Sequence, residues 1–217
     1  MGERDAQGRT AEIWSAIQGH KDCLSLLIDA GAGLDDQDLR GWTAAMWSAD
    51  QGHADCLGLL IGSGAELLVV DGSAKLAAMC AIEGGHEDCL SMLALEGFEL
   101  AAVDWNGMTA AMQAVYWGQA GCLSVLVSFG CDVNAKTEAR TTVAMYAAML
   151  GREDCLAILI EAGVDLELED QWGRTAALHA MKNGSVACAA MIASHFERRA
   201  LLAVTPNAKG FGLVLRV

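Results

Sequence analysis

The chain has 217 residues, of which 53% are apolar, and its 14 basic and 28 acidic side chains give a formal net charge of −14. This acidic balance argues against nucleic acid as a partner, because binding a phosphate backbone needs many lysine and arginine contacts. No apolar run reaches the roughly eighteen residues that a membrane span needs, and the opening MGERDAQGRT lacks the apolar stretch of a secretory signal. We therefore expect a protein that neither enters a membrane nor is secreted.

A period of 33 residues runs through nearly the whole chain. Six cysteines keep this step, at Cys23, Cys56, Cys89, Cys122, Cys155 and Cys188. An aspartate keeps it at Asp5, Asp38, Asp71, Asp104 and Asp170, with Thr137 in the remaining place. We divide the chain into a lead (1–4), units one to six (5–37, 38–70, 71–103, 104–136, 137–169 and 170–199) and a C-terminal extension (200–217).

Each unit is predicted to form a turn and then two short helices. The Asp-x-x-Gly start favours a turn, because aspartate bonds its own backbone and glycine accepts a positive φ. A threonine then stands in the N-cap place before an apolar run such as AAMWSA at 44–49. A glycine suited to a left-handed C-terminal residue ends the first helix. The second helix carries runs such as CLGLLI at 56–61, often with acids in its first turn, where the helix dipole favours them.

These units resemble the ankyrin repeat family, whose unit also has about 33 residues. Unit two matches the family pattern at Asp38, Gly41, Thr43, Ala49, Gly52, His53, Leu57, Leu59, Leu60, Gly64 and Ala65. The resemblance covers residues 5 to about 199. It implies an all-α solenoid of stacked helix–turn–helix units with short hairpin turns. It also implies a non-catalytic protein–protein interaction module that binds its partner on the concave face.

Several places depart from the family pattern. The family's inner-helix histidine is replaced by Ile13, Met46, Met79, Met112, Met145 and Leu178. We infer that apolar packing, to which the flexible methionine is well suited, replaces a hydrogen-bonded helix start. Ala74 and Arg140 stand where the turn glycine belongs, and Leu76 stands in the threonine place. A left-handed residue there would cost about 1–2 kcal/mol, so units three and five are predicted to be the weakest.

The two ends of the array are unusual. Glu12 and Lys21 are the polar residues that the first unit offers for an outer cap, whereas the extension ALLAVTPNAKGFGLVLRV stays apolar. Repeat arrays need polar outer surfaces at their ends for solubility. We expect the extension to fold back as a cap over unit six, and the alternative is that it contacts another chain.

The cysteines are predicted to be structural. His-x-x-Cys occurs at His20, His53 and His86, but a structural zinc site needs four converging ligands, and stacked helices lie about 8–10 Å apart. We therefore expect no metal and no cofactor. That helix spacing also argues against disulfides, and reduced thiols indicate a cytoplasmic protein. Cys80 and Cys131 lie outside the periodic row, and either could be an exposed reactive thiol.

Catalysis is not expected. No phosphate loop, paired-carboxylate motif or nucleophile elbow is present, and the acids fall mostly in turns and helix starts. Two alternatives to a binding module stay open. The chain could be a thiol or metal protein that uses the cysteine row, or the interaction segment of a larger enzyme.

The partner-binding surface is predicted from the places that form hairpin tips and the exposed inner-helix face in ankyrin-like proteins. These places hold four of the six tryptophans, while Trp14 and Trp47 are interpreted as core. The predicted binding residues are Arg40, Trp42, Trp105, Met108, Tyr116, Trp117, Trp172 and Arg174. Such residue types dominate binding hot spots. The near-neutral charge of these places on an acidic body suits another protein or peptide, acidic or amphipathic, that binds a monomer.

Overall fold

The computed structural model describes residues 3–72, 75–97, 103–104 and 106–204. Residues 202–204 are described by their backbone alone. Twelve α-helices make up this part of the chain. They are α1 (Ala11–Gln18), α2 (Lys21–Asp29), α3 (Ala44–Asp50), α4 (Ala54–Gly62), α5 (Ala77–Gly84), α6 (Glu87–Leu95), α7 (Ala110–Trp117), α8 (Ala120–Ser128), α9 (Val143–Leu150), α10 (Glu153–Glu161), α11 (Ala176–Lys182) and α12 (Val186–Val204).

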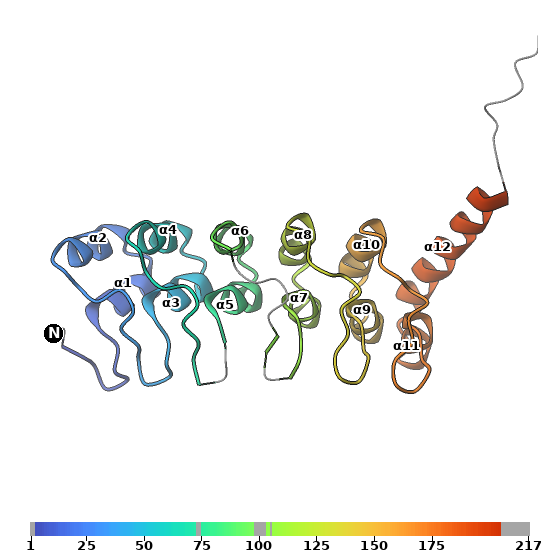
Figure 1. The fold of residues 1–217 in the computed structure, drawn as a ribbon, viewed down its shortest axis with the longest axis horizontal. Coiled ribbons are helices and arrows are strands. Elements are labelled where there is room, and N and C mark those ends of the chain that lie inside the picture. Colours follow the sequence, from blue (N-terminus) through green and yellow to red (C-terminus); the bar gives the residue numbers. More distant parts are fainter. Residues whose placement is uncertain (1–2, 73–74, 98–102, 105, 205–217) are drawn as a thin grey trace, which may run out of the picture.

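The helices stack into an elongated array of two rows (Figure 1). The odd-numbered helices form one row, the even-numbered helices form the other, and the long loops project from the odd-numbered row. Each odd-numbered helix packs against the even-numbered helix that follows it and against the next odd-numbered helix. The described residues include no strand, only isolated bridges between Val103 and Thr109 and between Lys136 and Thr142. The predicted all-α solenoid is confirmed.

Local sequence signals set the ends of the odd-numbered helices. In five units the N-cap threonine accepts a hydrogen bond from a backbone N–H of the first turn: Thr10, Thr43, Thr109, Thr142 and Thr175. Leu76, which replaces this threonine before α5, makes no side-chain cap. Arg140 replaces the turn glycine of unit five with φ 59°, so this turn does hold a non-glycine residue in the left-handed region. Ala74 lies outside the described residues.

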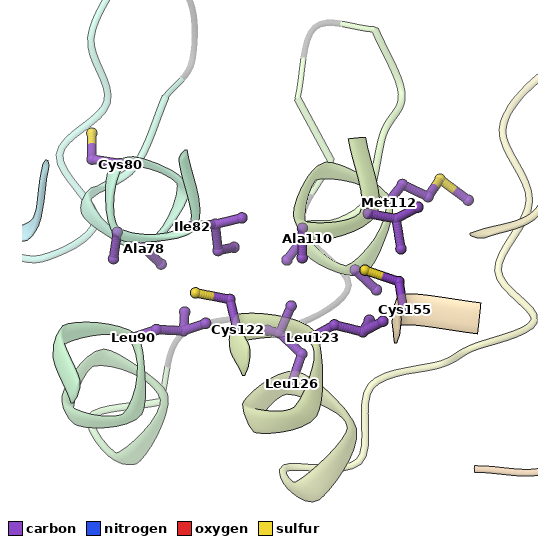
Figure 2. Packing of buried hydrophobic residues seen from close by; sticks show 14 of the residues in the cluster. Ala78, Cys80, Ile82, Leu90, Ala110, Met112, Cys122, Leu123, Leu126 and Cys155 are labelled. Carbon is purple, nitrogen blue, oxygen red and sulfur yellow. The ribbon is translucent and has the colours of Figure 1, made fainter. Parts of the chain in front are cut away.

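The core lies between the two rows (Figure 2). Met46, Met79, Met112 and Met145 are each 2% exposed or less, which matches the predicted apolar packing. Leucines at the start and middle of the even-numbered helices are equally buried, and Cys122 lies beside Leu90 and Ile82 of the preceding unit. Burying one methionine or leucine side chain stabilises the folded state by about 1.5–3 kcal/mol.

The helix start still carries a side-chain hydrogen bond. The side chain that makes it stands one residue after the place of the family's histidine, in the tenth place of a unit counted from its first residue. A side chain there donates to Oδ2 of the unit's first aspartate in four pairs: Trp14 with Asp5, Trp47 with Asp38, Gln113 with Asp104, and His179 with Asp170. The distances are 2.9–3.0 Å. These bonds fasten each loop to the helix that follows it.

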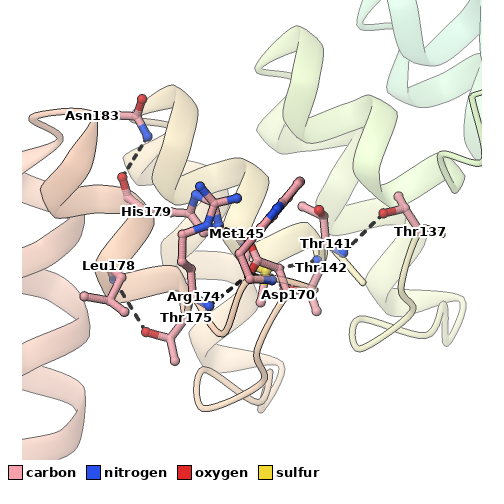
Figure 3. Close-up of polar contacts among 11 residues, drawn as sticks. Thr137, Thr141, Thr142, Met145, Asp170, Arg174, Thr175, Leu178, His179 and Asn183 are labelled. Atoms are coloured by element: carbon pink, nitrogen blue, oxygen red, sulfur yellow. Dashed lines mark hydrogen bonds and ion pairs between the residues drawn. The ribbon is translucent and has the colours of Figure 1, made fainter. Parts of the chain in front are cut away.

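Asp170 shows this arrangement most fully (Figure 3). It is buried and accepts from the backbone of Trp172 and Arg174, the Arg174 guanidinium and the His179 ring. Burial raises the pKa of this carboxyl, but the four donors outweigh it and hold the pKa of Asp170 below its usual value of 3.8. The carboxylate is therefore ionised wherever unit six is folded at ordinary pH.

The structure corrects two predictions about cysteines. Five cysteines of the periodic row are buried, but Cys23 is exposed, because no described residues pack on the side of unit one where the other units have a preceding neighbour. Cys80, interpreted as a candidate exposed thiol, is buried within α5. At the other end Leu178 is 48% exposed and Met181 is 70% exposed, since no further described unit packs against α11. The expected capping tail (200–217) lies largely outside the described residues.

Candidate partner-binding surface

A cleft of about 310 Å³ opens between units three and four. It lies on the inner-helix face, our name for the side formed by the odd-numbered helices and the loops that precede them. Residues of α5, α7 and the loop before each of them line it: Lys75, Met79, Glu83, Asp104, Asn106, Met108, Gln113, Tyr116 and Trp117. The volume is at the lower end of the range for ligand pockets, which suits one or two side chains.

The aromatic wall of the cleft comes from the last two residues of α7. Gly118 follows them with φ 77° and ends the helix, so Tyr116 and Trp117 stand at its rim. They are 48% and 47% exposed, and their rings meet edge to face with centroids 5.3 Å apart. Aromatic pairs prefer this geometry, so the wall is a fixed surface. Three of the predicted binding residues, Met108, Tyr116 and Trp117, therefore lie together.

The polar wall of the cleft carries one cation and two anions. Lys75 forms an ion pair with Glu83. Asp104 accepts hydrogen bonds from the backbone of Asn106 and Met108 and from the Gln113 side chain. No basic side chain of the described residues pairs with Asp104, so the charges of the cleft sum to −1.

Trp42 does not belong to an exposed rim, which corrects our expectation. It is 6% exposed and packs on Trp47 with ring centroids 4.6 Å apart. Arg40 lies over both rings, at 4.9 Å from the Trp42 centroid and 5.6 Å from the Trp47 centroid. Lys75, which belongs to the next unit, lies 4.9 Å from the Trp42 centroid. Trp42 is buried because the loop of unit three covers its indole, which the sequence pattern predicts at an exposed hairpin tip.

The other predicted binding residues lie elsewhere. Trp172 is 62% exposed on the loop before α11, with the Arg174 guanidinium 4.3 Å from its ring, and the structure does not bring this pair to the cleft. Trp105 lies outside the described residues. Trp14, interpreted as core, is 39% exposed with Arg9 at 4.0 Å from its ring, because no described unit covers that side of unit one.

The predicted binding residues do not include the half of the cleft that unit three supplies. Lys75, Met79 and Glu83 line it, and Lys75 stands in the same fifth place as Arg9 and Arg174. The place-by-place pattern does put Lys75 and Glu83 among the hairpin-tip and inner-helix positions. It could not have shown that the cleft opens between these two units, since the residues of every junction follow similar patterns.

The cysteines of the described region offer little to a metal or an electrophile. Burial raises the pKa of Cys80 to about 12 and the pKa values of Cys89, Cys122 and Cys131 to about 11. The thiolate is the reactive and ligating form, so these sulfurs are poorly suited to either chemistry. Within the described ranges no three His, Cys, Asp or Glu side chains lie close enough to hold one ion.

The stacked helix pairs and the cleft between two units define a helical repeat protein of the solenoid class. A family model described as ankyrin repeats, in three copies, matches residues 1–71, 65–137 and 130–200. The chain belongs to the ankyrin repeat family. No curated protein matches the chain.

Ankyrin repeats are generally protein–protein interaction modules, and their fold is typically non-catalytic. In the described part of the chain, no helix combines the length and apolar character that a membrane span requires. These statements set the class of function. The geometry of the inner-helix face bears on which kind of partner the protein binds.

Proposed function

We propose that this protein binds another protein non-covalently through its inner-helix face, with the cleft between α5 and α7 at the centre of the contact. The observation that carries the proposal is the exposed Tyr116–Trp117 pair at the rim of a formed cleft. Exposed apolar patches are uncommon on monomers unless they serve an interaction. Tyrosine and tryptophan are also the side chains that most often dominate binding energy.

Neighbouring side chains extend this surface along the array. Leu150, the last residue of α9, is 42% exposed at the place that Trp117 holds in α7. Met108 is half-buried on the loop before α7. Together with the aromatic pair they form an apolar strip across units four and five, which fits the apolar face of an amphipathic segment.

The charge of the chain favours an amphipathic partner with basic groups over an acidic one. The cleft sums to −1 and the chain to −14, so an acidic segment would meet repulsion at both scales. We propose a scaffold, adaptor or inhibitor that acts as a monomer in the cytoplasm and uses no cofactor, metal or nucleic acid.

Affinity capture from an extract of the source cells tests this function. The wild-type chain should retain a partner that the double variant Tyr116→Ser/Trp117→Ser loses, with affinity for the purified partner falling at least about tenfold. Leu26→Ser is the matched control, since it removes a 70% exposed apolar side chain of α2, outside the inner-helix face, and should bind as wild type. Equal affinity of wild type and the double variant would move the binding surface elsewhere, with the acidic even-numbered helices next in line.

A further inference from the structure

Every described tryptophan except Trp117 has a cation over its ring. Arg9 lies 4.0 Å from the Trp14 centroid, Arg40 and Lys75 each lie 4.9 Å from Trp42, Arg40 lies 5.6 Å from Trp47, and Arg174 lies 4.3 Å from Trp172. Trp117 is 47% exposed, and no arginine or lysine of the described residues lies over it. Among the described tryptophans, Trp117 is therefore the one whose ring has no cation over it.

The fifth place of a unit supplies three of the four cations that lie over these rings, Arg9, Lys75 and Arg174. Units one, three and six have a basic residue there, namely Arg9, Lys75 and Arg174. Arg9 and Arg174 each contact a tryptophan ring and pair through Nε with the first aspartate of their own unit, at 2.9 Å. Unit four keeps the aspartate, Asp104, but has Met108 in the fifth place. The unit that forms the aromatic wall thus lacks a cation in its fifth place.

The carboxylate oxygens of the first aspartates show the same difference between unit four and units one and six. Oδ2 of Asp5 accepts from both Arg9 and Trp14, and Oδ2 of Asp170 accepts from both Arg174 and His179. Oδ2 of Asp104 accepts from the Gln113 side chain at 3.0 Å, and no arginine of the described residues joins it. A carboxylate oxygen can accept two or more donors, so the second position at Asp104 is available to a guest.

Asp38 is the nearest comparison within the chain. Its Oδ2 also has a single side-chain donor, Trp47, but Asp38 is only 7% exposed. Asp104 instead lies in the wall of a cleft of about 310 Å³ that Trp117 also lines. The carboxylate and the open ring are therefore reachable from the same space.

We propose that this cleft binds an arginine side chain of the partner, with the guanidinium between the Trp117 ring and the Asp104 carboxylate. The proposal rests on the proposed function and names the chemistry of its central contact. The guest guanidinium would take the role that Arg9 and Arg174 perform within units one and six. Arginine suits this site better than lysine, because its planar group stacks on aromatic rings and donates in a fork to carboxylates. It would also neutralise the net charge of the cleft.

Peptide titration followed by nuclear magnetic resonance tests the proposal directly. The probe is a short peptide with a single arginine flanked by leucines, and its twin replaces arginine by citrulline, which has nearly the same shape and no charge. The arginine peptide should bind at least about tenfold more tightly than the citrulline peptide, with shifts at Trp117 and Gln113. Added salt should reduce the difference. Equal binding of the two peptides would show an apolar anchor site and overturn the assignment.

Variants of Met108 and Trp117 sharpen the test. Met108→Arg gives unit four the cation that units one and six already have, so it should fold, occupy Asp104 and Trp117 from within, and abolish preference for the arginine peptide. Trp117→Leu should lose at least about tenfold in affinity for the arginine peptide, and Trp172→Leu should not change it. Unchanged preference in Met108→Arg would refute the site.

The outcome is separable from that of the proposed function. If the purified partner still depends on Tyr116 and Trp117 but binds Met108→Arg normally, the protein-binding function stands and the arginine assignment fails. If the arginine peptide binds as described while no partner depends on the cleft, the chemistry of the cleft stands and the function must be sought elsewhere.

Discussion

The indole N–H of Trp42 donates a hydrogen bond to Oδ2 of Asp71 across 2.9 Å, and this contact ties unit two to unit three. In units one, two, four and six the first aspartate takes its side-chain donor from the tenth place of its own unit. Unit three has Cys80 in that place, buried at 0% exposure. The preceding unit therefore supplies the donor that the cysteine does not.

This relationship predicts that Trp42 is a stability residue. Trp42→Ala should lower the free energy of unfolding by about 3–5 kcal/mol, because it removes a buried aromatic ring and leaves a cavity. Urea unfolding followed by circular dichroism measures the change. Trp117→Ala is the matched control and should cost far less, since surface substitutions are usually within about 0.5 kcal/mol.

A contrary result would be equally clear. If Trp42→Ala unfolds at the wild-type urea concentration, the indole does not hold units two and three together, and its role as an exposed contact must be reconsidered. Trp42→Phe separates the two contributions. It keeps most of the ring packing and should cost about 1 kcal/mol for the lost N–H donor to Asp71.

Arg140 is predicted to be a correctable defect. Its φ of 59° lies in the left-handed region, where a side chain with a β-carbon costs about 1–2 kcal/mol and glycine does not. Arg140→Gly should therefore raise the midpoint of urea unfolding. Arg140→Ala keeps the strained backbone, loses the charge and should not raise it. A lower midpoint for the glycine variant would mean that the side chain contributes more than the strain costs. The sequence pattern predicts the same stabilisation for Ala74→Gly, because Ala74 also stands where the turn glycine belongs.

The cysteines should divide into one fast thiol and a slow group. Cys23 is exposed, so a thiol reagent at neutral pH should modify it within minutes in native protein. Burial and the raised pKa values of Cys80, Cys89, Cys122 and Cys131 should protect the others until unfolding. Cys23→Ser should abolish the fast phase. Several equally fast thiols would mean that the stack opens readily.

The same thiols predict the direction of the alkaline pH dependence. A raised folded-state pKa favours the folded state below the ordinary thiol pKa of 9.0, and this contribution is lost as pH rises through about 11. Stability should therefore fall in alkaline solution above about pH 9. Cys122→Ala should flatten that part of the pH profile.

Asp170 sets the acid side of the profile for unit six. Its folded-state pKa is lowered, so its stabilisation is present above the unfolded value of 3.8 and is lost as pH falls through the lower folded value. Asp170→Asn should be less stable than wild type at pH 7. The gap should narrow as pH falls below 3.8, because the wild-type carboxyl then loses its own advantage. A gap that stays constant down to pH 2 would show that charge is not the cause.

The period, the threonine caps and the glycine stops could all be predicted from the sequence. Each depends on bonds within a few residues: the Thr43 side chain reaches Met46 of the same turn, and Gly52 takes φ 73° two residues beyond the end of α3. From these local signals the helix pairs and the all-α solenoid follow. The Tyr116–Trp117 pair was also within reach, because residues at the end of an inner helix face away from the core.

Burial, however, belongs to the neighbouring unit, and only the tertiary structure decided it. Cys23 and Cys56 share the same His-x-x-Cys context, yet one is exposed and the other buried, because only the second has a unit packed before it. Trp42 and Trp172 both lie in loops, yet a following unit covers the first and none covers the second. The open position at Asp104 likewise became visible only when its donors could be compared with those of Asp5 and Asp170. A repeated sequence specifies each unit almost identically, whereas the free energy of burial depends on what is stacked beside it.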